Sequence, residues 1–178
     1  MKQVIQNSIL LTPHFALREF VESTTARKHG IANTPTAEAV ENLRRLCVNT
    51  LEPLRETLGL PVIITSGYRC RQLNDIIGHH SSQSQHLRGL AADFYVGWGS
   101  TEKSQRQSGN SHTPRERLIK AFRTILSDDS VDFDQLILYP TFIHVSYVSA
   151  KANRHHIMVA QDDGKYGHIS RTTALTIE

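Results

Sequence analysis

Hydrophobic residues recur at helical spacing in two long stretches of the chain. From Thr36 onward they fall three or four positions apart, which predicts one apolar helix face. This face consists of Val40, Leu43, Leu46, Cys47, Thr50, Leu51 and Leu54. Pro53 should kink this helix, because proline removes an internal hydrogen bond and clashes with the preceding turn. A second helix is predicted from Thr113 to about Ser127, since Thr113-Pro114-Arg115-Glu116 has the form of a capping box.

Three shorter helices are also predicted. Thr12-Pro13 offers a cap followed by proline at the first helical position, ahead of the apolar residues Leu17, Phe20 and Val21. Ser23 is expected to cap a second short helix, which Gly30 ends. The third is a turn or two of helix from Arg71 to Ile77.

Other segments alternate with a period of two, which is typical of strands. They are the run that includes Ala91, Asp93 and Tyr95 and the segment Phe142–Val148. Pro61–Thr65 is predicted to be a short buried strand, and Phe133–Leu138 a further strand. The tail from Ala152 is expected to form a hairpin that turns at Asp162-Asp163-Gly164. We therefore predict an α+β fold in a single domain, residues 1–178, with helices packed on one face of a small, largely antiparallel sheet. The polar stretch 97–111 is predicted to be a mobile surface loop, and residues 152–178 a hairpin tail.

The composition suits one globular domain. The chain has 178 residues, of which 39% are hydrophobic and 21% are charged, with a net charge of +3. It contains no apolar run near the ~20 residues of a membrane span, and no Lys/Arg run indicates a nucleic-acid partner. We expect a monomer, in the cytoplasm or released by lysis, because no secretory signal is visible. Cys47 and Cys70 are too few for a disulfide framework and are interpreted as buried thiols.

The run Ser84-Gln85-His86-Leu87-Arg88-Gly89-Leu90-Ala91-Ala92-Asp93 carries the clearest chemistry. An imidazole and a carboxylate stand seven residues apart, which fits a turn at His86, permitted by Gly89, followed by a strand that contains Asp93. One nitrogen and one oxygen make half of a zinc site, and a catalytic zinc usually takes one more protein ligand and a water. His144 is the predicted third ligand, provided that its strand pairs beside the Asp93 strand.

These residues resemble the Ser-x-His-x-x-Gly-x-Ala-x-Asp signature of the zinc D-Ala-D-Ala carboxypeptidases and the related phage endolysins. Matches to the same family run in order along most of the chain. They are Leu11-Thr12-Pro13-His14-Phe15, Glu19-Phe20, Glu41-Asn42-Leu43, Pro53-Leu54-Arg55, Ile64-Thr65-Ser66-Gly67-Tyr68-Arg69, Phe133-Asp134-Gln135-Leu136-Ile137 and His144-Val145-Ser146-Tyr147. The resemblance implies the hedgehog/DD-peptidase-like fold and a Zn²⁺-dependent hydrolysis of an amide bond in peptidoglycan stem peptides, by a carboxypeptidase or an endolysin-type endopeptidase.

The resemblance also assigns roles around the metal. An arginine at the position of Arg69 engages the carboxylate of the substrate or the developing oxyanion, and a guanidinium fork suits either. Ser84 either hydrogen-bonds the substrate or braces its own loop. The general base has no clear counterpart, because the Glu or His that the family carries shortly before its last zinc ligand is missing.

Asp134 and Tyr139 are the catalytic candidates near that position. Strand alternation places them on opposite faces, so that only one should point at the metal unless the strand is bulged. His79-His80 in the preceding loop offers imidazoles that could serve instead. The missing acidic residue favours an alternative function, a non-catalytic relative that keeps the zinc and binds cell-wall peptide, for example as part of a phage particle. A purely structural zinc ranks last, because no fourth protein ligand is evident.

Overall fold

The computed structural model describes residues 9–78, 81–98, 113–160 and 165–177. The helices are α2 (Leu17–Val21), α3 (Thr24–Lys28), α4 (Ala37–Leu46), the π-helical η1 (Cys47–Leu51), α5 (Glu52–Leu58), α6 (Arg71–Ile77), the 3-10 helix η2 (Gln85–Arg88), α8 (Pro114–Ser127) and α9 (Arg171–Leu175). The strands are β1 (Leu10–Thr12), β2 (Phe15–Ala16), β3 (Val62–Ser66), β4 (Ala91–Val96), β5 (Gln135–Leu138), β6 (Ile143–Ser146), β7 (His156–Ala160) and β8 (Tyr166–His168).

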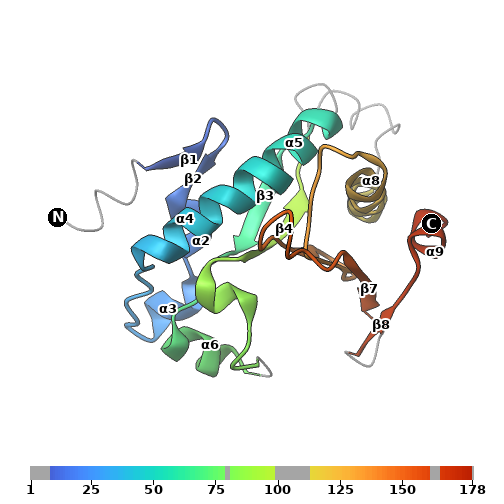
Figure 1. Cartoon of the computed structure of the whole chain (residues 1–178). Helices are drawn as coiled ribbons and strands as arrows, with labels where there is room; N and C mark the ends of the chain where they lie inside the picture. Colours follow the sequence, from blue (N-terminus) through green and yellow to red (C-terminus); the bar gives the residue numbers. More distant parts are fainter. Residues whose placement is uncertain (1–8, 79–80, 99–112, 161–164, 178) are drawn as a thin grey trace.

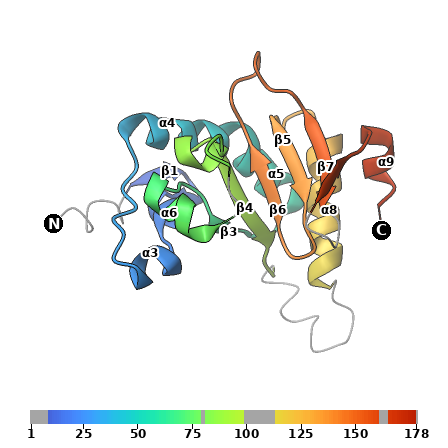
Figure 2. The same ribbon diagram turned by 90° about the horizontal axis from the view of Figure 1, so that it is seen from below.

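The fold is α+β, as the sequence predicts. Six strands form one sheet in the order β3-β4-β6-β5-β7-β8, and β1 and β2 form a separate hairpin. Within the large sheet β5 and β7 run parallel, while the other neighbouring pairs are antiparallel. Figure 2 shows these strands side by side, with the helices α4, α5 and α8 on the far side of the sheet in that view.

The two faces of the sheet differ in chemistry because alternate residues point to opposite sides. One face packs against the long helices through buried side chains that include Ala92, Phe94, Leu136 and Val145. The other face carries Asp93 beside His144, and His144 beside Ile137 on the next strand. The polar face is therefore the one that presents the predicted zinc ligands.

The helix that begins at Thr36 continues through α4, η1 and α5, and Figure 1 shows it running along the sheet. Thr36 caps it by accepting a hydrogen bond from the amide of Ala39. The π-helical turn η1 ends at Leu51, two residues before Pro53. A π-helical turn changes the hydrogen-bonding pattern where proline cannot donate, so the predicted distortion appears as this segment.

The predicted helix start at Thr12-Pro13 is wrong. Thr12 ends β1 and pairs with Phe15, so that Pro13 lies in the turn of a hairpin. The extended backbone buries Leu11 and Phe15, and this burial outweighs the local capping signal. Helix α2 starts only at Leu17, where the Glu19 carboxylate accepts a hydrogen bond from the Ala16 amide.

The tail from residue 152 forms the predicted pair of strands, β7 and β8, and its turn lies outside the described residues. The short helix α9, which the sequence analysis missed, follows and packs on α8. The predicted loop 97–111 lies outside the described residues except for its first two positions. No helix among the described residues is long and apolar enough to cross a membrane.

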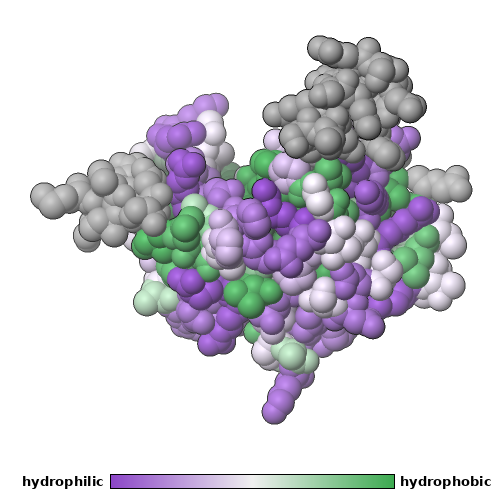
Figure 3. Space-filling model, turned by 90° about the horizontal axis from the view of Figure 1, so that it is seen from above, coloured by the Kyte–Doolittle hydropathy of each residue, from purple (hydrophilic) through white to green (hydrophobic). Residues whose placement is uncertain are grey.

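The surface is mixed in polarity. Figure 3 shows one face on which hydrophilic residues surround separate, smaller hydrophobic patches. Scattered exposed apolar residues of this kind are ordinary on protein surfaces and do not by themselves indicate a partner.

Candidate metal centre

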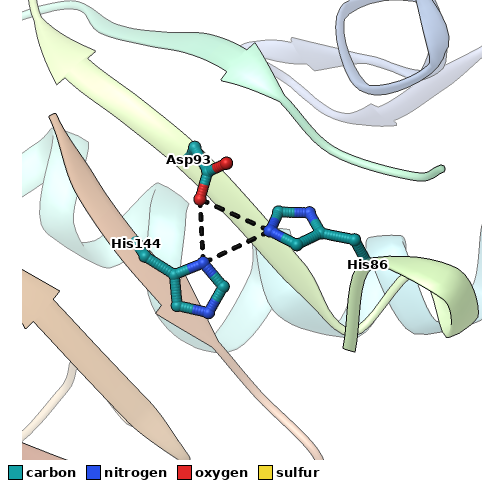
Figure 4. Close-up of side chains that lie close together, drawn as sticks. All are labelled: His86, Asp93 and His144. Atoms are coloured by element: carbon teal, nitrogen blue, oxygen red, sulfur yellow. Dashed lines mark hydrogen bonds and ion pairs between the residues drawn. The ribbon is translucent and has the colours of Figure 1, made fainter. Parts of the chain in front are cut away.

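His86, Asp93 and His144 converge at one point on the polar face of the sheet (Figure 4). β4 and β6 pair with Asp93 directly opposite His144, as the prediction of a third ligand required. His144 Nδ1 lies 2.8 Å from Asp93 Oδ1, and His86 Nε2 lies 3.4 Å from the same oxygen and 3.3 Å from His144 Nδ1. Two nitrogens and one oxygen therefore face a common centre from a loop and two adjacent strands.

The loop that carries His86 is held close to α4. Gly89 ends η2 with a φ of 68°, in the left-handed region that glycine adopts readily. A Cβ atom at this position would overlap the backbone carbonyl of Ala39 in α4. Asn42 adds a hydrogen bond from its amide to the carbonyl oxygen of Arg88, 2.9 Å away. The glycine of the signature therefore allows both the turn and the close approach of this loop to the helix.

His86 has a defined binding nitrogen. Its Nδ1 lies 2.6 Å from the carbonyl oxygen of Gly67, which can only accept a hydrogen bond, so Nδ1 carries the proton and Nε2 is left with a free lone pair. Burial lowers the pKa of His86, which favours the neutral form that binds metals. An imidazole that donates its other N–H to a carbonyl is the usual arrangement of a metal-bound histidine.

Asp93 is oriented by Arg69. The Arg69 Nη2 donates to Asp93 Oδ2 across 2.7 Å, and its Nε donates to Ser66 Oγ across 2.9 Å. Burial opposes ionisation of Asp93, but its electrostatic interaction with His86 and the hydrogen bond from His144 hold the pKa of Asp93 well below the ordinary value. Asp93 is consequently an ionised carboxylate, with one oxygen on Arg69 and the other facing the histidines.

This set of donor atoms fits a zinc ion. Zinc binds imidazole nitrogen and carboxylate oxygen, and a site with three protein ligands keeps an open position. No fourth His, Cys, Asp or Glu joins the cluster among the described residues. Cys47 is buried away in the long helix, and burial raises its pKa well above the ordinary value, so it remains a protonated thiol. Cys70 is half-buried rather than buried.

A cleft of about 590 Å³ lies over the cluster. Its lining includes Arg69, Ser84, Asp134 and Tyr139, which are the remaining predicted site residues. That only one of Asp134 and Tyr139 points at the metal stays a prediction: both residues line the cleft, but Asp134 is bound to Arg154 rather than to the three ligands. Both flank β5 rather than belong to it, since this strand extends only from Gln135 to Leu138, and the pleat of the strand does not fix their directions.

Asp134 is fully buried, with an ion pair to Arg154 Nη2 at 2.5 Å. Burial opposes its ionisation, but the hydrogen bonds from Arg154 and Gln85 lower the pKa of Asp134 to about 2. Tyr139 stacks on Phe142, with ring centroids 4.3 Å apart, and burial raises the pKa of Tyr139 to about 12. At neutral pH the carboxylate is thus a very weak base, and the phenol remains protonated.

Ser84 stands at the start of η2 and lines the cleft, while its hydroxyl makes no hydrogen bond to another described residue. The imidazoles of His79 and His80 lie outside the described residues.

The structure adds three residues that the sequence analysis did not single out. Gln85 and Arg154 both bind Asp134, and Tyr166 from β8 lies half exposed at the rim of the cleft, edge-on to Tyr139. Gln85 lies within the signature, but nothing in its spacing distinguishes it. Arg154 and Tyr166 are single polar residues in the tail, and only the β5–β7–β8 pairing brings them to the site.

A family model described as Peptidase M15 matches residues 13–126 of this chain. The match covers more than half of the chain, and the chain belongs to this metallopeptidase family. The matched segment contains His86 and Asp93, and it ends before His144, which the sheet brings to the site. Peptidases of this family are generally zinc-dependent, in agreement with the donor set described above. A search of curated proteins finds no match to the chain.

Proposed function

We propose that this protein is a zinc peptidase that hydrolyses an amide bond in peptidoglycan stem peptides, as a carboxypeptidase or an endopeptidase. The observation that carries the proposal is the convergence of His86, Asp93 and His144 beneath an open cleft. Three protein ligands with room for a water molecule are characteristic of catalytic rather than structural zinc sites. Zinc bound in such a site supplies an activated water and polarises the carbonyl that is attacked.

Arg69 has two tasks in this proposal. Its Nε and Nη2 donate hydrogen bonds to Ser66 and Asp93, so the edge of the guanidinium formed by these two nitrogens is already occupied. No described residue accepts a hydrogen bond from Nη1, and Arg69 lines the cleft, so Nη1 is the group available to a carboxylate or oxyanion of the substrate. Arg69 would therefore orient a metal ligand and contact the substrate with the same side chain.

Tyr139 is assigned the role of hydrogen-bond donor. A phenol with a pKa of about 12 keeps its proton at neutral pH, so it can donate to a developing negative charge but cannot accept a proton from water. Asp134 remains a candidate base from its sequence position. Its ion pair with Arg154 makes it a weak one, because a carboxylate of pKa about 2 holds a proton poorly at neutral pH.

The weakness of Asp134 as a base favours the second candidate function, a zinc-containing module that binds cell-wall peptide without cleaving it. Apart from the three clustered ligands, the described residues of the cleft include no carboxylate or imidazole that is free of a partner. Removal of a positioned base typically costs about 10²- to 10⁴-fold in rate, so the first function predicts slow rather than absent hydrolysis.

One experiment separates the two functions. Purified protein is incubated with peptidoglycan fragments, and the products are identified by mass spectrometry before chelation, after chelation and after zinc is restored. The peptidase proposal predicts new amine and carboxyl termini that disappear on chelation and return with zinc. Saturable binding of the fragments without cleavage at any pH would support the binding module instead.

A further inference from the structure

Asp134 has an unusually complete set of polar contacts. Its Oδ1 accepts hydrogen bonds from the backbone N–H and the Nε of Arg154, each across 2.9 Å. Its Oδ2 accepts from Arg154 Nη2 at 2.5 Å, Gln85 Nε2 at 2.8 Å and Ser146 Oγ at 3.4 Å. The carboxylate is completely shielded from solvent, and these contacts leave little capacity for a reacting molecule.

The partners of Asp134 belong to the segments that carry the zinc ligands. Gln85 immediately precedes His86, and Ser146 follows His144 by two residues on the same face of β6. The Gln85–Asp134 bond joins residues 49 positions apart, and it ties the end of η2 to the beginning of β5. Gly89 allows the C-terminal end of η2 to lie against α4. The Gln85–Asp134 bond restrains the opposite, N-terminal end of η2.

We infer that Asp134 is a positioning residue that holds the His86 turn against the sheet through Gln85, with Arg154 as its counter-ion, rather than the general base. This inference rests on the proposed zinc site. The imidazole of His86 must point at Asp93 and His144 within a few tenths of an ångström for all three donors to reach one ion. The residues that orient metal ligands usually change metal affinity about 10- to 100-fold when they are replaced.

The test measures zinc affinity rather than activity. Gln85→Leu removes the hydrogen bond at similar side-chain volume and leaves the Asp134–Arg154 ion pair in place. Gln83→Leu is the matched control, because Gln83 lies in the same loop, is exposed, and makes no side-chain hydrogen bond to a described residue. The zinc dissociation constant of each variant is obtained by competition with a chromophoric chelator, and the melting temperature of each metal-free protein is recorded.

We expect Gln85→Leu to weaken zinc binding about 10-fold or more, and Gln83→Leu to leave it unchanged. Asp134→Asn should weaken it by at least as much. The double variant should be no weaker than Asp134→Asn alone, because both substitutions break the same connection. If Asp134→Asn does not fold, the comparison of Gln85→Leu with Gln83→Leu still decides the question.

Two results would overturn the inference. One is a wild-type zinc affinity in Gln85→Leu, whether or not its melting temperature falls, since this would leave the bond a merely structural role. The other is an Asp134→Asn protein that binds zinc normally and loses only turnover, as a general base would. Neither result bears on the peptidase proposal, which fails separately if the zinc-loaded wild-type protein does not cleave peptidoglycan fragments.

Discussion

Replacement of Gly89 by alanine tests the way in which the His86 turn is built. Gly89 has a φ of 68°, and an added Cβ would overlap the Ala39 carbonyl oxygen and lie 3.1 Å from its carbonyl carbon. Both atoms belong to the backbone of α4 and cannot move aside as a flexible side chain could. The substitution therefore forces the turn and the helix apart as well as straining the residue itself.

The magnitude follows from two separate costs. The left-handed conformation costs alanine about 1–2 kcal/mol relative to glycine, and overpacking of a well-packed contact typically costs about 1–3 kcal/mol. Gly59 has a φ of 63° with nothing within 4 Å of an added Cβ, so Gly59→Ala has the first cost without the second. In a protein of this size 1 kcal/mol shifts the melting temperature by about 2–4 °C. Gly89→Ala should thus melt about 2–12 °C below Gly59→Ala. Both substitutions also reduce the entropy of the unfolded chain, and this shared effect cancels when the two variants are compared.

The assay is thermal unfolding followed by circular dichroism on metal-free and zinc-loaded protein. In Gly89→Ala the gain in melting temperature on adding zinc should also be smaller, because displacement of the turn moves His86 relative to its partners. Equal melting temperatures for the two alanine variants would refute the proposed clash with α4. A full zinc-dependent gain in Gly89→Ala would refute the proposed link between this turn and the metal site.

Three further substitutions test other parts of the site. Arg69→Lys keeps the charge but cannot hold Ser66 and Asp93 together, and we expect kcat/KM to fall about 10- to 100-fold with weaker zinc binding; steady-state kinetics at wild-type rates would contradict this. Tyr139→Phe should lower kcat by about 10²-fold without changing the shape of the pH–rate profile, because the lost group is a donor; loss of a limb of that profile would show that it is a base. Arg154→Gln should destabilise the protein at pH 5, with the difference shrinking as the pH falls toward 2. The ionised Asp134 stabilises the folded protein above its unfolded pKa of about 3.9. This contribution is lost as Asp134 is protonated through its folded pKa of about 2. A difference in urea-unfolding free energy between wild type and Arg154→Gln that stays constant with pH would contradict the assigned Asp134–Arg154 ion pair.

Local patterns in the sequence predict helix α8 and the turn and strands that carry the three zinc ligands. The capping box at Thr113 predicts a helix to about Ser127, and α8 runs from Pro114 to Ser127. The alternation around Asp93 and His144 predicts their faces correctly, because a buried sheet face leaves strong hydrophobic periodicity in both strands. The spacing of His86, Gly89 and Asp93 predicts the turn and strand that the structure contains.

The remaining features depend on contacts between distant residues. The environment of Asp134 depends on Gln85 and Arg154, which lie 49 positions before it and 20 positions after it. No local pattern in the sequence reports such a pairing, so the sequence places Asp134 only by its position next to a predicted strand. The same limit explains the error at Thr12, where the burial of Leu11 and Phe15 favours a hairpin over a well-formed local helix signal.

X-ray absorption spectroscopy of the zinc-loaded protein tests the central claim most directly. The account predicts one zinc ion per chain, with two imidazole nitrogens and oxygen ligands at about 2.0–2.1 Å, and loss of the metal in Asp93→Ala. Sulfur ligands at about 2.3 Å, full zinc occupancy in Asp93→Ala, or no bound zinc would contradict the assignment of His86, Asp93 and His144 as the metal centre.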